Sequence, residues 1–276
     1  MRALTAFVKE YRLMRTHSSF AIVIAASVLA SILAATAAGQ GAAAGQGAAA
    51  NQGKTQPEPP AGPAPHLANG RVSFAGLWRP ADIFLIEDVS LGLPKGDTVP
   101  LNAWAQEAMK KHLSKDDPEA NCLPTGVPRH APYPWKIVED PPYIYFLFEG
   151  NIHSFRQIFM DGRKHPADPN PTWYGHSTGK WDGDTLVVDT VGFNDLFWFD
   201  FVGHPHTEKL HTIERYTRPD LGTLKEDVTI DDSGAYTKPF TVNASHRLLP
   251  GDELMEYICQ ENQKDTRHLV GPAGRP

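Results

Sequence analysis

The chain has 276 residues with 26 basic and 32 acidic side chains, which give a formal charge of −6 at pH 7. Residues 1–37 hold four of the basic side chains and one of the acidic ones, so the other 22 basic and 31 acidic side chains carry a charge of −9. This acidic balance argues against nucleic acid and anionic membranes as partners of the chain after residue 37.

The first part of the chain has the pattern of a secretory signal peptide. Four basic residues precede a nearly continuous apolar run from Phe20 to Ala35, and small residues follow it. Ala35-Thr36-Ala37 is a suitable cleavage site, which assigns residues 1–37 to the signal and predicts a periplasmic or secreted protein without membrane contact afterwards. An uncleaved membrane anchor is the alternative, because the apolar run approaches the length that spans a bilayer.

Residues 38–66 are rich in Ala, Gly, Gln and Pro and show no apolar periodicity, so we expect a disordered tether. Residues 67–276 then suit one domain. The two cysteines, Cys122 and Cys259, both lie in this part, where an oxidising compartment would permit a disulfide. Two buried free thiols are the alternative.

The elements expected in chain order are one strand, one helix and then a long series of strands. Residues 71–78 alternate loosely and predict the first strand, and Asn102 can cap a helix over residues 102–113. Frequent prolines then prevent regular structure until Trp135. Period-two patterns predict the later strands, at residues 135–138, 143–149, 152–160, 174–181, 184–191, 208–217, 223–230, 240–248 and 254–260.

The connections between these strands are mostly short and carry turn residues, as at Asp182-Gly183 and Pro250-Gly251-Asp252, so neighbouring strands should be antiparallel. The predicted fold is therefore all-β: an antiparallel meander β-barrel of lipocalin-like type with one short N-terminal helix, since closure hides strand edges. A jelly-roll sandwich is the alternative, and no parallel βαβ pattern is present.

The hairpin at Asp182-Gly183 predicts a specific pair of side chains. If these two residues form a type I′ turn, His176 lies directly across from Asp189. The carboxylate would then fix the tautomer of the imidazole and raise its basicity, as a general base requires. A purely structural hydrogen bond is the alternative, and a bulged turn would change the register and abolish the pair.

A serine motif overlaps this hairpin, because Gly175-His176-Ser177-Thr178-Gly179 matches the Gly-x-Ser-x-Gly nucleophile elbow. The elbow needs a buried strand before it and a helix after it, whereas prolines precede this motif and a hairpin follows, so we reject an α/β-hydrolase. Ser177 remains a candidate nucleophile on another scaffold, with His206 or His211 as its base.

A possible metal site follows in the loop before the strand at residues 208–217. Alternate residues of an extended segment project to one side, so His204, His206 and Glu208 could converge on a divalent metal. Pro205 and the short spacing to Glu208 weaken this interpretation, and the alternative is a polar loop whose histidines bond locally. We expect no other cofactor.

Substrate contacts are predicted from an isolated charge and from aromatic residues. Arg156 lies inside an alternating run, and if it points into a barrel it could anchor an anionic ligand group, although an outward Arg fits equally. Tyr174, Trp181 and Trp198 are candidate contacts for an aromatic or hydrophobic small molecule. The aromatic loop at residues 193–201 is either a satellite core or the lid of a pocket.

Three runs of the sequence resemble a large family of exported bacterial proteins: RQIFMDGRKHPADPNPTWYGHSTGKWDGDTLVVDTVGFND, GHPHTEKLHTIERY and EYICQEN. The resemblance extends over roughly half the chain and implies a secreted or periplasmic β-rich domain, without transferring an activity. The segment Phe74-Ala75-Gly76-Leu77-Trp78 also resembles the Gly-x-Trp of lipocalin first strands.

The sequence thus favours an exported enzyme that applies histidine and carboxylate acid-base chemistry to a small, partly aromatic molecule, by hydrolysis or elimination. His176 with Asp189 would be the base, His206 or His211 the acid, and Glu208 a second carboxylate. The alternatives are a lipocalin-like binding protein and a metal-dependent hydrolase or oxygenase that uses the His-x-His-x-Glu segment.

Overall fold

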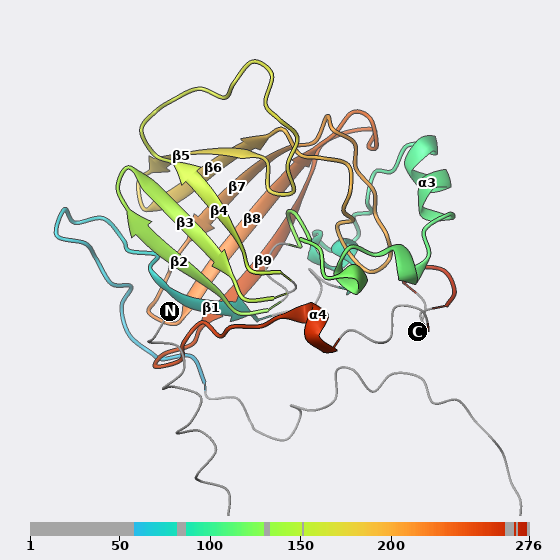
Figure 1. The fold of residues 1–276 in the computed structure, drawn as a ribbon. Helices are drawn as coiled ribbons and strands as arrows, with labels where there is room; N and C mark the ends of the chain where they lie inside the picture. Colours follow the sequence, from blue (N-terminus) through green and yellow to red (C-terminus); the bar gives the residue numbers. More distant parts are fainter. Residues whose placement is uncertain are drawn as a thin grey trace, which may run out of the picture. The chain divides into compact units, whose positions relative to one another are not determined.

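The computed structural model describes residues 58–81, 87–129, 133–150, 152–262, 268 and 270–274. The predicted signal and the tether up to residue 57 lie outside the described residues. Over the described part, the chain forms a closed barrel whose nine strands neighbour one another in sequence order (Figure 1). The predicted all-β barrel is confirmed, and this closed meander excludes the jelly roll.

The strands of the barrel are β1 (Gly76–Pro80), β2 (Trp135–Asp140), β3 (Tyr143–Phe148), β4 (Ser154–Phe159), β5 (His176–Asp182), β6 (Thr185–Val191), β7 (His211–Thr217), β8 (Thr223–Asp231) and β9 (Phe240–Leu248). The helical elements are short: η1 (Val89–Gly92), α3 (Ala103–Met109), η2 (Ser114–Asp116), η3 (Glu119–Asn121) and α4 (Cys259–Asn262). No helix among the described residues is long and apolar enough to cross a membrane.

The predicted helix is present but shorter than expected. Asn102 caps α3 as predicted, because its Oδ1 accepts the N–H of Ala105 at 2.9 Å. The helix ends at Met109, and residue Leu113 instead makes a β-bridge to Pro272. Ala105 is the buried residue of this helix, whereas Trp104 is 49% exposed.

The predicted strand at residues 254–260 is wrong. Its backbone bonds to side chains instead of a neighbouring strand: the Met255 N–H donates to Glu149 Oε2 and the Tyr257 N–H to His153 Nε2. The segment ends in α4, where Cys259 forms the predicted disulfide with Cys122. The cross-link therefore holds this segment beside the barrel without adding a strand to it.

The barrel departs from the predicted antiparallel arrangement at one place, where β4 and β5 run parallel. Strand directions cannot alternate all the way around a closed ring of nine members, so at least one neighbouring pair must be parallel. Parallel strands need a long crossover connection. Residues 160–175 form it, and they are the long loop above the barrel in Figure 1.

The interior of the barrel is filled by large side chains, including Trp78, Trp135, Phe146 and Tyr216. A second buried cluster contains three rings of the aromatic loop, Phe193, Phe197 and Phe199, together with residues of β8 and β9. The loop at residues 193–201 therefore contributes mainly to the core, which is the first of its two predicted interpretations.

A chain of buried polar bonds crosses the interior. Arg156 of β4 donates from Nη1 to Glu214 Oε1 at 2.8 Å and from Nη2 to Glu214 Oε2. The Tyr216 hydroxyl lies 2.7 Å from Glu214 Oε1 and 2.8 Å from Glu226 Oε1, and Glu226 Oε2 lies 2.8 Å from His246 Nε2. Although burial opposes it, the Glu214 carboxylate raises the pKa of Arg156, so this guanidinium stays charged.

Replacing Arg156 by Met would leave the Glu214 carboxylate buried without a counter-charge, so we expect the free energy of unfolding to fall by about 3–5 kcal/mol. The double variant Arg156→Met, Glu214→Leu removes both charges and should recover most of this loss in urea denaturation. The control Arg215→Met breaks an exposed pair with Asp182 and should change stability little. Equal stability of Arg156→Met and the wild type would contradict the role of this pair.

Candidate functional site

A cavity of about 630 Å³ opens in the barrel wall where β4 and β5 diverge. The two strands pair only at Ile158↔Ser177 and Phe159↔Thr178. Before these pairs the chains separate, and residues 154–157 and 172–177 form opposite sides of the opening. The remaining lining residues are Pro124, His153, Phe159, Pro166, Pro169 and Asn170.

Gly175 turns the crossover loop into β5 at the edge of this cavity. Its φ of +63° lies in the left-handed region that favours glycine. A Cβ atom there would lie 2.6 Å from Thr190 Cγ2 and 2.7 Å from the Val191 carbonyl oxygen. The glycine therefore permits β5 to enter the barrel at this angle and places His176 and Ser177 on the cavity lining.

The predicted register of the β5–β6 hairpin is wrong by two residues. Asp182 pairs with Thr185, so Gly183 is the first central residue of the turn, and its φ of +60° fits a type II′ turn instead of type I′. His176 consequently lies across from Val191, and Asp189 lies across from Thr178. A slip of two residues keeps the face of every side chain, so His176 and Asp189 still share one face of the hairpin.

His165 of the crossover loop connects these two residues. Its Nδ1 lies 2.8 Å from His176 Nδ1, and its Nε2 lies 3.0 Å from Asp189 Oδ1. Asp189 Oδ1 is also 3.0 Å from His211 Nε2 on β7. The structure thus brings together three of the predicted catalytic residues: His165, which was not a predicted site residue, links His176 to Asp189, and His211 bonds to Asp189 directly.

The hydrogen bonds of this group define the tautomers of two rings. An ionised Asp189 only accepts, so His165 Nε2 donates to it, and a neutral His165 then accepts at Nδ1. The proton of the Nδ1–Nδ1 bond therefore belongs to His176. A neutral His176 protonated at Nδ1 carries its lone pair on Nε2, which is the atom that can accept a proton from a substrate.

The surroundings of His176 favour its neutral form. Burial lowers its pKa first, and the nearby His165 and Arg163 lower it further. The ring also stacks on Phe159 with centroids 5.0 Å apart, which fixes its orientation. His176 is therefore a positioned, neutral imidazole on the lining of the cavity.

The inner side of the cavity contains the predicted anchor Arg156 and the predicted nucleophile Ser177. Ser177 Oγ accepts from Arg156 Nε at 2.9 Å and from Thr190 Oγ1 at 3.0 Å, so both of its lone pairs are engaged. This bonding argues against nucleophilic attack by Ser177, and neither His206 nor His211 bonds to it. Ser177 can instead donate its hydroxyl proton.

Tyr174 lines the same cavity, as a predicted substrate contact should. Its hydroxyl lies 3.1 Å from Ser154 Oγ, and its ring stacks on Phe148. Burial raises the pKa of Tyr174 to about 12, so its hydroxyl keeps its proton at neutral pH. The two predicted tryptophans lie outside the lining: Trp181 packs on Phe74, and Trp198 stacks on His112.

The predicted metal ligands do not converge in the structure. His206 is buried between Phe197 and Phe199, and its Nε2 has no hydrogen-bond partner among the described residues. Glu208 is exposed, and His204 bonds to Asp200. The backbone turns through this segment without strand structure, so alternate residues do not project to one side as the extended pattern would require.

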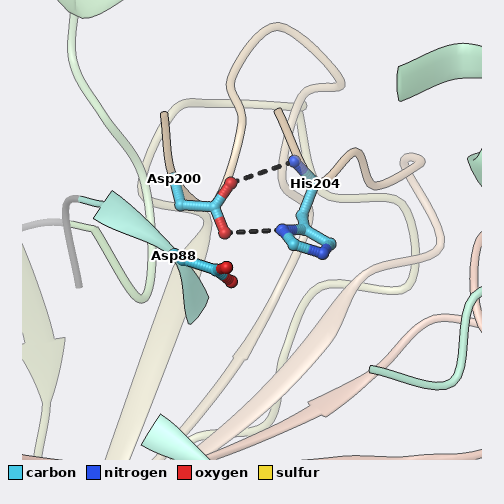
Figure 2. Close-up of side chains that lie close together, drawn as sticks. All are labelled: Asp88, Asp200 and His204. Carbon is cyan, nitrogen blue, oxygen red and sulfur yellow. Dashed lines mark hydrogen bonds and ion pairs between the residues drawn. The ribbon is translucent and has the colours of Figure 1, made fainter. Parts of the chain in front are cut away.

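Among the described residues, one group of at least three side chains has ligand atoms close enough for a metal ion: Asp88, Asp200 and His204 (Figure 2). Figure 2 shows Asp200 bonded to both the backbone N–H and the ring Nδ1 of His204. Asp200 also accepts the N–H groups of Val89 and Gly203. These four donors explain the buried carboxylate as a cross-link between η1 and the loop before β7.

The pH dependence of stability should report on His206. Burial lowers its pKa to about 4, whereas an unfolded histidine titrates near 6.5. The unfolded chain therefore binds one more proton between these values, and stability should fall by about 3 kcal/mol as the pH drops from about 6.5 to about 4.

The variant His206→Phe removes this titration and should flatten the pH dependence of urea denaturation in that window, whereas the exposed control His66→Gln should not. An unchanged slope in His206→Phe would show that this histidine is not the group responsible.

Comparison of the chain with models of protein families, with characterised proteins and with solved structures found no match.

Proposed function

We propose that this protein is an exported enzyme that uses His176 as a general base on a small, partly aromatic molecule held in the cavity between β4 and β5. The observation that carries the proposal is the hydrogen-bonded chain Asp189–His165–His176, which ends on the cavity lining. Catalytic bases are commonly oriented in this way by a second and a third group.

The hydrogen bonds among Asp189, His165 and His176 stabilise the positive charge that His176 acquires when it acts as a base. When His176 Nε2 takes a proton, the ring becomes cationic and its Nδ1–H bond to His165 strengthens. His165 in turn donates to Asp189, whose negative charge stabilises the cation. His211 bonds to the same oxygen of Asp189 and holds that carboxylate in place, so we assign it a positioning role.

Two reactions suit a base of this kind. It can remove a proton from a substrate carbon in an elimination, or it can remove a proton from a water molecule that attacks an ester or amide carbon. Where negative charge develops on a substrate oxygen, the hydroxyl groups of Ser177 and Tyr174 are hydrogen-bond donors on the cavity lining that can stabilise it. Because the lone pairs of Ser177 are engaged, a covalent serine intermediate has little support.

Export is the second part of the proposal. It is supported by the signal-like pattern of residues 1–37 and by the Cys122–Cys259 disulfide, which is typical of oxidising compartments.

A small-molecule binding protein is the alternative function, favoured by the aromatic and proline side chains of the cavity. A lipocalin-like protein would hold its ligand along the barrel axis, where this protein places Trp135, Phe146 and Tyr216. The cavity in the wall would therefore be the ligand site in either case, and the effect of removing His176 separates the two functions.

The direct test uses two chromogenic probes, nitrobenzisoxazole for elimination and p-nitrophenyl acetate for hydrolysis. We expect the wild type to accelerate at least one of them and His176→Gln to lower that rate about 100-fold. The rate should rise with pH through a pKa below the ordinary value for histidine, since burial lowers that of His176. His165→Gln should retain part of the rate and change the pH profile.

The control His66→Gln alters an exposed histidine outside the cavity and should match the wild type. A rate that is the same in His176→Gln and the wild type would exclude His176 as the base and favour the binding protein.

A further inference from the structure

The charged and titratable groups on the cavity lining are either paired within the protein or neutral. Arg156 is 2% exposed, and its charge is matched by both oxygens of the buried Glu214 carboxylate. The other described residues of the lining include no Asp, Glu or Lys. The guanidinium is therefore part of an internal ion pair, and it offers a ligand no free charge.

The two histidines of the lining are uncharged for separate reasons. His153 Nε2 accepts the backbone N–H of Tyr257 at 2.8 Å, so this nitrogen carries no proton and the ring is neutral. His176 is held in a neutral tautomer with its lone pair on Nε2, and burial lowers its pKa. Arg163, which lowers that pKa further, is itself paired with Asp161, whose two carboxylate oxygens both lie 2.9 Å from its Nε.

An ion that enters such a cavity loses water and gains no opposite charge. The desolvation of a carboxylate or an ammonium group then costs far more than that of a neutral polar group. The neutral donors and acceptors of the lining belong to Ser154, Gln157, Asn170, Thr172 and Tyr174. Such groups can bond to a neutral ligand but cannot neutralise an ion, so the lining favours uncharged ligands over ions of either sign.

The other walls of the cavity are apolar. Phe155 is 62% exposed on one side of the opening, Trp173 lies on the opposite side, and Phe159 belongs to the lining as well. Pro166 and Pro169 add further apolar surface. Aromatic and proline surfaces favour a planar aromatic body, and the volume of about 630 Å³ suits a small molecule.

We propose that the ligand class of this cavity is the small, uncharged aromatic molecules, such as aromatic esters, amides and ketones, and that aromatic acids and amines bind weakly in their ionised forms. This inference rests on the proposed function in taking the cavity as the substrate site, and it adds the charge of the substrate. Hydrolysis of an aromatic ester by water gives an alcohol and an acid that ionises at neutral pH. The product acid should then bind less tightly than the ester, which favours its release.

The test compares three probes of similar shape by calorimetric titration of the full chain: methyl naphthyl ketone, naphthoate and naphthylmethylammonium. The ketone is uncharged and is not hydrolysed, whereas the other two probes carry opposite charges. At about pH 8, where an ordinary histidine is neutral, we expect the ketone to bind at least about tenfold more tightly than either ion.

The variant Gln157→Lys places a free positive charge on the cavity lining. It should raise the affinity for naphthoate at least about tenfold and change that for the ketone less than about twofold, because only the ion gains a counter-charge. The control Gln106→Lys makes the same change at an exposed position of α3 outside the cavity, and it should leave all three affinities unchanged.

Binding of either ion as tightly as the ketone, or no binding of the ketone at millimolar concentration, would overturn the proposal. So would an affinity for naphthoate that Gln157→Lys does not raise; if that variant does not fold, the order of the wild-type affinities decides alone. Repeating the titration with His176→Gln separates this inference from the proposed catalysis, because the preference for the ketone should survive the loss of the base. If the chromogenic test fails while the ketone is still preferred, the proposed catalysis is wrong and the ligand class stands.

Discussion

A barrel closed by nine strands must contain a parallel pair, because strand directions cannot alternate around an odd ring. In this protein the pair is β4 and β5, and the crossover loop that the pair requires brings Trp173 to the cavity and His165 to His176. The two strands stay paired over only two residues, so the wall opens beside Arg156 and Ser177. The cavity and the histidine chain are therefore both consequences of how the barrel closes.

Side-chain bonds replace the missing strand pairing on the inner side of this opening. Arg156 connects β4 to β5, β6 and β7, and the buried chain continues from Glu214 to His246 on β9. The outer network of histidines begins at the neighbouring residue of β5, since Ser177 points inward and His176 outward. Strand β5 thus presents the Ser177 hydroxyl to the inner side of the site and the His176 imidazole to the outer side. Consecutive side chains of a β-strand point to opposite faces, which explains this arrangement.

Local patterns in the sequence were sufficient for most of the fold, because alternation and turn residues depend on near neighbours. The segment at residues 254–260 was wrongly predicted to be a strand because its apolar residues Met255 and Tyr257 fit an alternating pattern. With a tenth strand, all neighbouring strands of the closed barrel could have been antiparallel. The predicted register was wrong because Gly183 fits either the second central position of a type I′ turn, after Asp182, or the first central position of a type II′ turn, before Asp184. His165 could not be found from its turn-like surroundings, since its contacts depend on the path of the crossover loop.

The proposed role of His176 as a base requires that Asp189 and His165 hold it with its proton on Nδ1 and its lone pair on Nε2. Nitrogen NMR of the imidazole rings at neutral pH measures this directly, with the His176 signals assigned by their loss in His176→Gln. We expect a protonated Nδ1 coupled through its hydrogen bond to Nδ1 of His165, and an unprotonated Nε2. A proton on Nε2 of His176, or no coupling between the two Nδ1 atoms, would contradict this tautomer.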